Sequence, residues 1–344
     1  MTSWNGAIVG CGFFAHNHLH GWGELKERCA IRAVCDIDGG KAQAAADAFG
    51  IPNVYTNIEE LLARETLDFV DIVTTAPSHR ALVEACARRG VATVVQKPLA
   101  PDWADASALV ATMDRAGRPL MVHENFRFQA PLSRAADVLR SGVIGEAVWG
   151  QFSFRTGYDI YAGQPYLAEV ERFVLLDLAI HVLDIARVFM GEAETVACRS
   201  QSVRPGIKGE DMATVMLGHR GGATSIVDVT YASRQTPDPF PQTLLHVDGR
   251  QGSIRLDREF HLTVTTPEGT TREVVAPHAS AWMSPQWVLI QDSVVATQRH
   301  WLDCLDGGAE PATSGRDNLK TFALVEASYR SAAAGGSLVT PEVF

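Results

Sequence analysis

The sequence has little positive charge. Its 30 Lys and Arg residues stand against 40 Asp and Glu residues, which gives the 344-residue chain a formal net charge of −10. Binding to nucleic acid or to an anionic membrane surface needs basic patches, and this balance disfavours them. The start of the chain lacks the charged and apolar segments of a signal peptide, and no apolar run is long enough to span a bilayer. The sequence therefore predicts no nucleic-acid partner and no membrane association.

Paired cysteines, repeats and low-complexity linkers are also missing. The six cysteines lie far apart and form no CxxC pair. This spacing is typical of reduced core thiols in a cytoplasmic protein. Because 344 residues are many for a single core, we expect two domains.

What is present is a glycine-rich turn near the start of the chain. The apolar run at residues 5–9 is typical of a buried strand and leads directly into Gly10 and Gly12. Gly10 would allow a tight turn, and Gly12 would let the backbone approach a pyrophosphate at the start of the following helix. Ala15 stands where a third glycine often lies, and a second apolar strand ends at Asp36. An isolated glycine turn is weak evidence, but the strand before it and the acid about 20 residues further on favour dinucleotide binding.

Two kinds of pattern divide the chain. Strand and helix signals first alternate, which predicts a parallel sheet covered on both faces. Beyond residue 148, strand-like runs accumulate and two amphipathic helices close the chain, which predicts an α+β domain with a large, mainly antiparallel sheet. We therefore expect an NAD-binding Rossmann domain at 1–125 and a substrate-binding and oligomerisation domain at 126–344. The C-terminal helices could pack back on the first domain.

Several polar residues could carry chemistry. Lys97 follows an apolar strand and precedes a proline, so its backbone is extended and its ammonium is aimed off the sheet edge, unless it is an ordinary surface lysine. Asp177 and His181 share one face of a helix predicted over about residues 173–190. They could be an acid orienting a general base, half of a metal site, or a satisfied polar pair. Two further stretches, 75–79 and 123–127, follow predicted strands at the edge where doubly wound folds bind ligands.

A metal site and a catalytic cysteine are disfavoured. His16, His18 and His20 open the helix under the turn, so capping and surface roles are favoured over metal binding. Cys11 stands between the two glycines, where only its backbone would be needed by phosphates. Since the ammonium of Lys97 opposes a divalent cation, we predict catalysis without a metal.

In combination these residues resemble the Gfo/Idh/MocA oxidoreductases over nearly the whole chain. The resemblance rests on Ala7–Gly12, Asp36, Gln96-Lys97-Pro98 and the helix with Asp177, His181 and Asp184. It implies a Rossmann domain followed by an open-faced α/β domain, often paired into homodimers or homotetramers through the C-terminal sheet. It also implies that the lysine and the Asp/His pair line a sugar site.

Two departures from the family pattern suggest a subgroup. Gln96 stands in place of the usual glutamate, and Ala81 replaces a histidine often found two residues past His79. Together with Gln96-Lys97-Pro98, the stretches 123–127 and 163–167 resemble most a subgroup that acts on D-apiose.

The resemblance implies an NAD-dependent dehydrogenase that oxidises a small sugar, with D-apiose as candidate, at its hemiacetal carbon to a lactone. Lys97 would hold the reacting oxygen, His181 would take its proton, and Asp177 would bind a neighbouring hydroxyl or orient the base. The expected cofactor-binding residues are Gly10, Gly12, Phe13, Phe14, Asp36, Thr75, Pro77, His79, Gln96 and Lys97. The expected substrate-binding residues are Asn125, Arg155, Tyr158, Gln164, Asp177 and His181.

Three alternatives remain at this stage. They are an NAD-dependent inositol or polyol dehydrogenase of the same family, a non-catalytic NAD-binding regulator, and a glycosidase that recycles the hydride. The presence of both Lys97 and His181 argues against the regulator.

Overall fold

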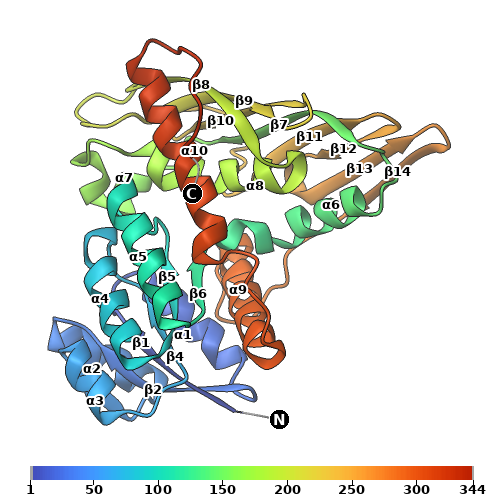
Figure 1. The fold of residues 1–344 in the computed structure, drawn as a ribbon. Coiled ribbons are helices and arrows are strands. Elements are labelled where there is room, and N and C mark those ends of the chain that lie inside the picture. Colours follow the sequence, from blue (N-terminus) through green and yellow to red (C-terminus); the bar gives the residue numbers. More distant parts are fainter. Residues whose placement is uncertain (1–2, 343–344) are drawn as a thin grey trace. The chain divides into compact units, whose positions relative to one another are not determined.

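The computed structural model describes residues 3–342, which fall into two compact units. Unit 1 comprises the chain through Asn125 together with Ser293–Leu319, and unit 2 comprises Phe126–Asp292 and the chain from Lys320 onward. The sequence also places a boundary after residue 125, and the structure adds the return of Ser293–Leu319 to unit 1. Figure 1 labels the helices and strands of both units.

Unit 1 is built on a six-stranded parallel sheet in the order β3-β2-β1-β4-β5-β6. Its strands are β1 (Trp4–Val9), β2 (Cys29–Cys35), β3 (Asn53–Tyr55), β4 (Phe69–Ile72), β5 (Ala92–Gln96) and β6 (Leu120–His123). Its helices include α1 (Ala15–Glu24), α2 (Gly39–Phe49), α3 (Ile58–Arg64), α4 (Ala76–Arg89) and α5 (Trp103–Ala116). The order reverses between β1 and β4, and ligands of doubly wound folds bind where the order reverses. The predicted Rossmann sheet is confirmed.

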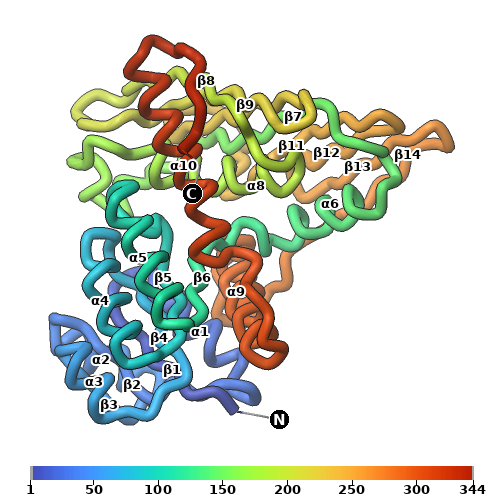
Figure 2. Tube along the Cα trace, in the orientation of Figure 1, coloured from blue at the N-terminus to red at the C-terminus, as the bar shows by residue number. Residues whose placement is uncertain are grey.

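The core of unit 1 explains why a late segment of the chain belongs to it. The ring of Phe69 on β4 packs against Trp22 of α1 at 4.9 Å and against Trp301 at 6.2 Å between ring centroids. Trp301 lies in α9 (Val288–Gly307). In Figure 2 the orange-red α9 accordingly lies beside blue elements of unit 1. Gly6 on β1 makes room for this cluster, because a Cβ there would lie 2.4 Å from the Phe69 ring.

Unit 2 is built on an eight-stranded sheet in the order β14-β13-β12-β11-β7-β10-β9-β8. Its strands are β7 (Ala147–Arg155), β8 (Ala193–Gln201), β9 (Met212–His219), β10 (Thr224–Thr230), β11 (Leu244–Gly249), β12 (Gly252–Leu256), β13 (His261–Thr266) and β14 (Gly269–Val274). Only the β7–β10 pair is parallel among these described strands. Its helices include α6 (Ala130–Arg140) and α8 (Ile180–Met190), and α10 (Gly315–Ala333) continues into unit 2. The predicted large, mainly antiparallel sheet is confirmed.

The helix predicted over residues 173–190 consists of two different parts. A π-helical turn, Leu175–Ala179, precedes α8. The buried Glu210 carboxylate accepts hydrogen bonds from the backbone N–H groups of Phe173 and Leu175 at 3.2 and 3.0 Å. A distant side chain therefore satisfies donors at the start of this helix, in the manner of a cap. Asp177 lies inside the widened turn, a type of distortion that is frequent at functional sites.

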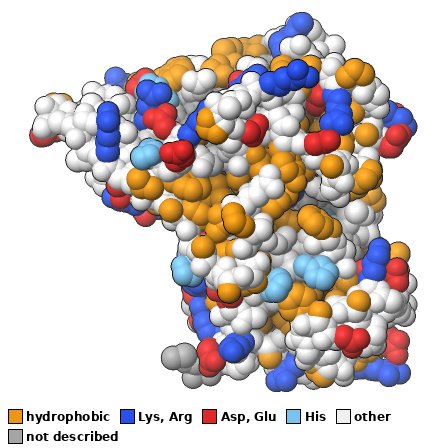
Figure 3. All heavy atoms as spheres, turned by 180° about the vertical axis from the view of Figure 1, so that it is seen from behind, with side chains coloured by type: hydrophobic (Ala, Val, Ile, Leu, Met, Phe, Trp, Pro, Cys, Tyr) orange, Lys and Arg blue, Asp and Glu red, His pale blue; other side chains and the backbone are white. Residues whose placement is uncertain are grey.

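The surface drawn in Figure 3 carries both signs of charge. On the face of the molecule drawn in Figure 3, lysine and arginine side chains are interspersed with acidic ones and form no continuous basic stripe. Within residues 3–342, no helix is both long and apolar enough to cross a membrane.

Candidate active site

The glycine turn has the geometry that a pyrophosphate requires. Gly10 has a φ of 97°, and a Cβ there would lie 2.6 Å from the carbonyl oxygen of Val73, so only glycine fits. No atom lies within 4 Å of the position that a Cβ on Gly12 would take, so the backbone there is open to a ligand. Helix α1 begins just beyond, and the side chain of its cap residue Phe14 makes no capping bond. The turn and the helix start therefore fit a pyrophosphate.

Asp36 lies at the end of β2, beside the turn. Its carboxylate accepts hydrogen bonds from the backbone N–H groups of Cys11 at 2.7 Å and Asp38 at 2.8 Å, which fixes its position. The Asp38 carboxylate instead caps α2 through the N–H of Gly40 at 2.9 Å. Ile37 is 97% exposed next to Asp36. A fixed carboxylate beside an exposed apolar side chain fits the ribose and adenine of a dinucleotide.

The residues that follow β4 mainly shape the backbone at the start of α4. Thr75 is the cap residue of α4, and Pro77 lies in its first turn, where proline is favoured. His79 is fully buried, with Nδ1 at 3.1 Å from the carbonyl oxygen of Leu99 and Nε2 at 3.1 Å from that of Thr74. Burial lowers the pKa of His79, against the effect of these carbonyl groups. His79 thus connects the loops after β4 and β5. It would support cofactor binding by holding these loops in place.

Gln96 and Lys97 lie at the carboxyl end of β5. The Oε1 atom of Gln96 accepts the backbone N–H of Lys97 at 2.7 Å, and its Nε2 atom lies 3.2 Å from Nε2 of His18. His18 in turn contacts the Asp71 carboxylate on β4 at 2.8 Å. His18 and Asp71 are fully buried. The predicted surface or capping role is therefore wrong for His18, because its ring is enclosed beneath the motif that contains Lys97.

The other two histidines of α1 do not join it in a metal site. His16 and His20 lie against the ring of Phe49, at 5.8 and 4.8 Å between ring centroids. Among the described residues, no group of three or more His, Cys, Asp or Glu side chains is arranged to hold a metal ion.

In unit 2, the ring of His181 lies in an aromatic environment. Its ring stacks on Phe126 at 4.0 Å with an interplanar angle of 7°, and both residues are 4% exposed. Burial, and then the charge of Asp177, raise the pKa of Tyr166 to about 12 and that of Tyr231 well above its ordinary value. Both phenols therefore stay protonated as hydrogen-bond donors near Asp177. The sequence placed Phe126 in the candidate stretch 123–127 but gave it no role, and it did not identify Tyr231, because neither residue's relation to the helix of His181 is periodic in the chain.

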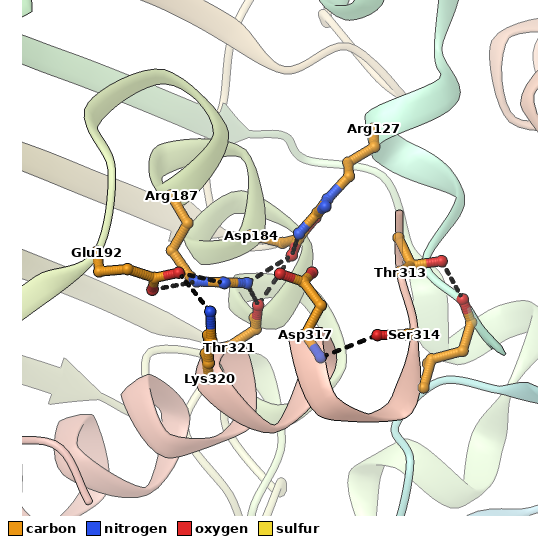
Figure 4. Close-up of polar contacts among 10 residues, drawn as sticks. Arg127, Asp184, Arg187, Glu192, Thr313, Ser314, Asp317, Lys320 and Thr321 are labelled. Carbon is orange, nitrogen blue, oxygen red and sulfur yellow. Dashed lines mark hydrogen bonds and ion pairs between the residues drawn. The ribbon is translucent and has the colours of Figure 1, made fainter. Parts of the chain in front are cut away.

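A buried ionic cluster holds α8 in place (Figure 4). Arg127 donates two hydrogen bonds of 2.6 Å to the carboxylate of Asp184, one turn beyond His181. Arg187 and Asp184 both bond Thr321 of α10, at 2.7 and 2.8 Å. Burial alone would raise the pKa of Asp184, but the Arg127 guanidinium lowers it on balance. The helix that carries His181 is thus fixed by a charged side chain only three residues away from it.

Two of the predicted substrate residues, Asn125 and Arg155, bond to other side chains in the structure. Asn125 is buried and donates from Nδ2 to the hydroxyl of Ser293 at 2.7 Å within unit 1. Arg155 pairs with Asp228 of the neighbouring strand at 2.7 Å. Because side chains alternate along β7, Arg155 lies on the face of the sheet opposite Phe154. The structure therefore does not bring Arg155 together with His181, whose partner Phe126 packs near Phe154.

Two further predicted substrate residues, Tyr158 and Gln164, lie in the irregular segment after β7. The ring of Tyr158 stacks on Phe240 at 4.0 Å, and Trp287 meets the Phe240 ring edge-on at 5.3 Å. Gln164 accepts a hydrogen bond of 3.1 Å from the hydroxyl of Tyr166. Through Tyr166, Gln164 lies in the same region as Asp177.

The fold and these residues define an NAD-binding oxidoreductase. The family model described as "Oxidoreductase family, NAD-binding Rossmann fold" matches residues 4–124, and that of the "GFO/IDH/MocA C-terminal domain" matches residues 132–255. The chain belongs to the Gfo/Idh/MocA family.

Some relatives are similar over their full length. Two proteins named D-apiose dehydrogenase, from Rhizobium rhizogenes and Paraburkholderia graminis, are 52% identical over 335 residues. The matches cover 97% of this chain, and 97% and 89% of those proteins. A solved oxidoreductase from Agrobacterium radiobacter, in complex with NAD+, L-tartaric acid and magnesium, is 51% identical with a TM-score of 0.96 and 98% coverage of both chains. A myo-inositol 2-dehydrogenase of Thermotoga maritima is 24% identical, covering 94% of this chain and 95% of that protein.

Proposed function

We propose that the chain is an NAD-dependent dehydrogenase that oxidises D-apiose at its hemiacetal carbon to the lactone. The observation that carries this proposal is the 52% identity to two D-apiose dehydrogenases over 97% of the chain. The open turn at Gly12 and the fixed Asp36 carboxylate support NAD as its cofactor.

In the proposed reaction each polar group has a separate task. NAD supplies the acceptor for the hydride that leaves the hemiacetal carbon. Lys97 donates a hydrogen bond to the reacting oxygen, and His181 takes the proton of that oxygen. Asp177 accepts a hydrogen bond from a neighbouring hydroxyl, and the protonated phenol of Tyr231 donates to another. Loss of one hydride and one proton converts the hemiacetal to a lactone, so the step balances.

The test is a panel of aldoses and polyols, with apiose, xylose and myo-inositol included, followed by NADH absorbance. We expect the highest kcat/KM with D-apiose and a lactone as the first product. A higher kcat/KM with myo-inositol would make the polyol alternative correct. Net NADH formation from a free sugar would exclude a regulator and a hydride-recycling glycosidase as the main activity.

We also propose that the chain forms a homodimer or homotetramer through the sheet of unit 2. Phe152 of β7 faces α8, since its ring lies 5.7 Å from Phe189. Side chains alternate along each strand, so Trp149, Met216 and Ile226 lie on the opposite face of the sheet, away from α8. Met216 is 42% exposed. These apolar side chains lie beside the Arg155–Asp228 ion pair on the same face, and a second copy of the chain would cover this mixed surface.

A cytoplasmic location is part of the same proposal. All six cysteines are free and buried. Their dispersed positions leave no pair suited to a disulfide framework, which fits a reducing compartment.

A further inference from the structure

A chain of buried hydrogen bonds runs from the backbone of Lys97 into the core of unit 1. Gln96 is 8% exposed, and His18 and Asp71 are fully buried. The Lys97 N–H meets Oε1 of Gln96 at 2.7 Å, Nε2 of Gln96 meets Nε2 of His18 at 3.2 Å, and Nδ1 of His18 meets Oδ2 of Asp71 at 2.8 Å. Four groups from α1, β4 and the end of β5 are thus connected in series.

The groups at the two ends of this hydrogen-bond series determine which atom donates and which accepts in each bond. A backbone N–H can only donate, so the Gln96 atom facing Lys97 is the carbonyl oxygen, and the amide NH2 faces His18. Nε2 of His18 must then be the unprotonated, accepting nitrogen. Its proton lies on Nδ1 and is donated to Asp71, which also accepts the indole N–H of Trp22 at 2.8 Å. His18 is therefore neutral, in the Nδ1–H tautomer.

A carboxylate at position 96 would change this arrangement. Both of its oxygens accept, so that His18 would have to donate from Nε2 as well as from Nδ1 and would carry a positive charge. His18 would then be an imidazolium between two carboxylates, with the ring of His123 4.2 Å away and the ammonium of Lys97 on the adjacent residue. The glutamine makes the connection to Lys97 without a charge.

We infer that Gln96, His18 and Asp71 form a positioning device that fixes the backbone of Lys97, in which the uncharged Gln96 holds a neutral His18 in the Nδ1–H tautomer. This rests on the proposed role of Lys97 at the reacting oxygen. None of the three side chains needs to touch the sugar. They act by fixing where the Lys97 side chain begins, and a small displacement of a group that contacts the reacting atoms costs large factors in rate.

The first test reads the tautomer directly in the NAD-bound protein. Long-range ¹H–¹⁵N spectra of histidine-labelled protein should show one buried imidazole in the neutral Nδ1–H form, assigned by its loss in His18→Asn or by its proximity to the Trp22 indole proton. The Gln96→Glu variant should convert this signal to an imidazolium. A native His18 in the Nε2–H or doubly protonated form would overturn the inference.

The second test separates positioning from folding. Gln96→Leu removes the acceptor of the Lys97 N–H, so kcat should fall about tenfold or more while the melting temperature changes little. Gln96→Glu keeps that acceptor and should restore most of the turnover. The matched control is His16→Asn, an exposed histidine of the same helix, which should leave kcat unchanged. Native kcat in Gln96→Leu, or a loss that follows melting temperature alone, would contradict the inference.

The two proposals fail in different ways. Normal turnover in Lys97→Ala would refute the proposed catalytic role of Lys97. The tautomer of His18, measured separately, would be unaffected by that result. A wrong tautomer with an inactive Lys97→Ala would refute the positioning device and leave the proposed reaction in place.

Discussion

At the residue scale, the side chains of both units are held by partners that are distant in sequence. His18 and Asp71 are 53 positions apart, and Arg127 and Asp184 are 57 positions apart. Such pairs carry no periodic signal, so local patterns cannot predict them. The sequence could single out Lys97, Asp177 and His181 as candidates, because strand ends and helix faces are local features. It named Arg127 and Asp184 but could not predict that they pair.

Asp36 should determine the choice of cofactor. Its carboxylate can accept ribose hydroxyls and would repel a 2′-phosphate. We expect NAD to give the higher kcat/KM in the native protein, and Asp36→Ser to reduce that preference at least tenfold. Asp36→Asn is the control that keeps an acceptor oxygen for the N–H of Cys11 but loses the charge. A native preference for NADP, or an unchanged preference in Asp36→Ser, would disprove this role.

Lys97 and His181 should act as a unit. If both serve one oxygen in one step, Lys97→Ala and His181→Ala should each lower kcat about 100-fold or more, and the double variant should be little worse than the poorer single one. The melting temperature, measured on the same samples, should stay near native, and NAD should still bind because the glycine turn and Asp36 are unchanged. Additive losses, or turnover that falls only with stability, would show two independent structural roles.

At the element scale, patterns predicted long helices and core strands better than local distortions. The predicted helix over 173–190 is real, but its π-helical turn depends on Glu210, which lies more than 30 positions away. Strand β3 has three residues and β14 is exposed throughout, so neither shows clear alternation. Helix α6 was also missed, although five of its residues are buried.

The ionic cluster should make a large contribution to the stability of α8. Removing Arg127 would leave the fully buried Asp184 carboxylate without its bidentate partner, so Arg127→Met should lower the free energy of unfolding by about 3 kcal/mol. The control is Arg134→Met, since the Arg134–Glu273 pair is exposed and should contribute less than about 1 kcal/mol. Denaturant unfolding measures both. Equal effects of the two variants would show that the buried cluster has no special weight.

The same cluster gives a pH dependence of known sign. Arg187 and Lys320 outweigh burial and lower the pKa of Glu192 from 4.5 to about 2. A carboxyl group with a depressed folded-state pKa stabilises the fold above its unfolded pKa and loses that contribution as the pH falls. Stability should therefore decline between about pH 4.5 and 2, and the decline should be smaller in Glu192→Gln, as measured by melting temperature across this window.

At the scale of the whole molecule, the chain order of the two units follows from simple patterning. Alternating strands and helices gave the parallel sheet, and the change to successive strands marked the second unit. The sequence raised the possibility that the C-terminal helices pack back on the first domain, but it could not specify the segment Ser293–Leu319, because that return depends on how Trp301 packs on Phe69.

The uncovered face of the second sheet should govern assembly. Met216→Glu places a charge on that face, so we expect a lower oligomer mass by light scattering, with native secondary structure. Met212→Ala, on the same strand, is the milder control. An unchanged mass in Met216→Glu would show that another surface joins the copies.

The burial of every cysteine has a practical consequence for spectroscopy. Burial raises the pKa of Cys11, Cys29, Cys86 and Cys198 to about 12, so their thiols are protonated and shielded at neutral pH. Maleimide reagents attack thiolates that are accessible, and the folded chain offers few of them. A single cysteine introduced at an exposed site such as Val143, which is 43% exposed, can therefore carry a fluorophore without prior removal of the native six.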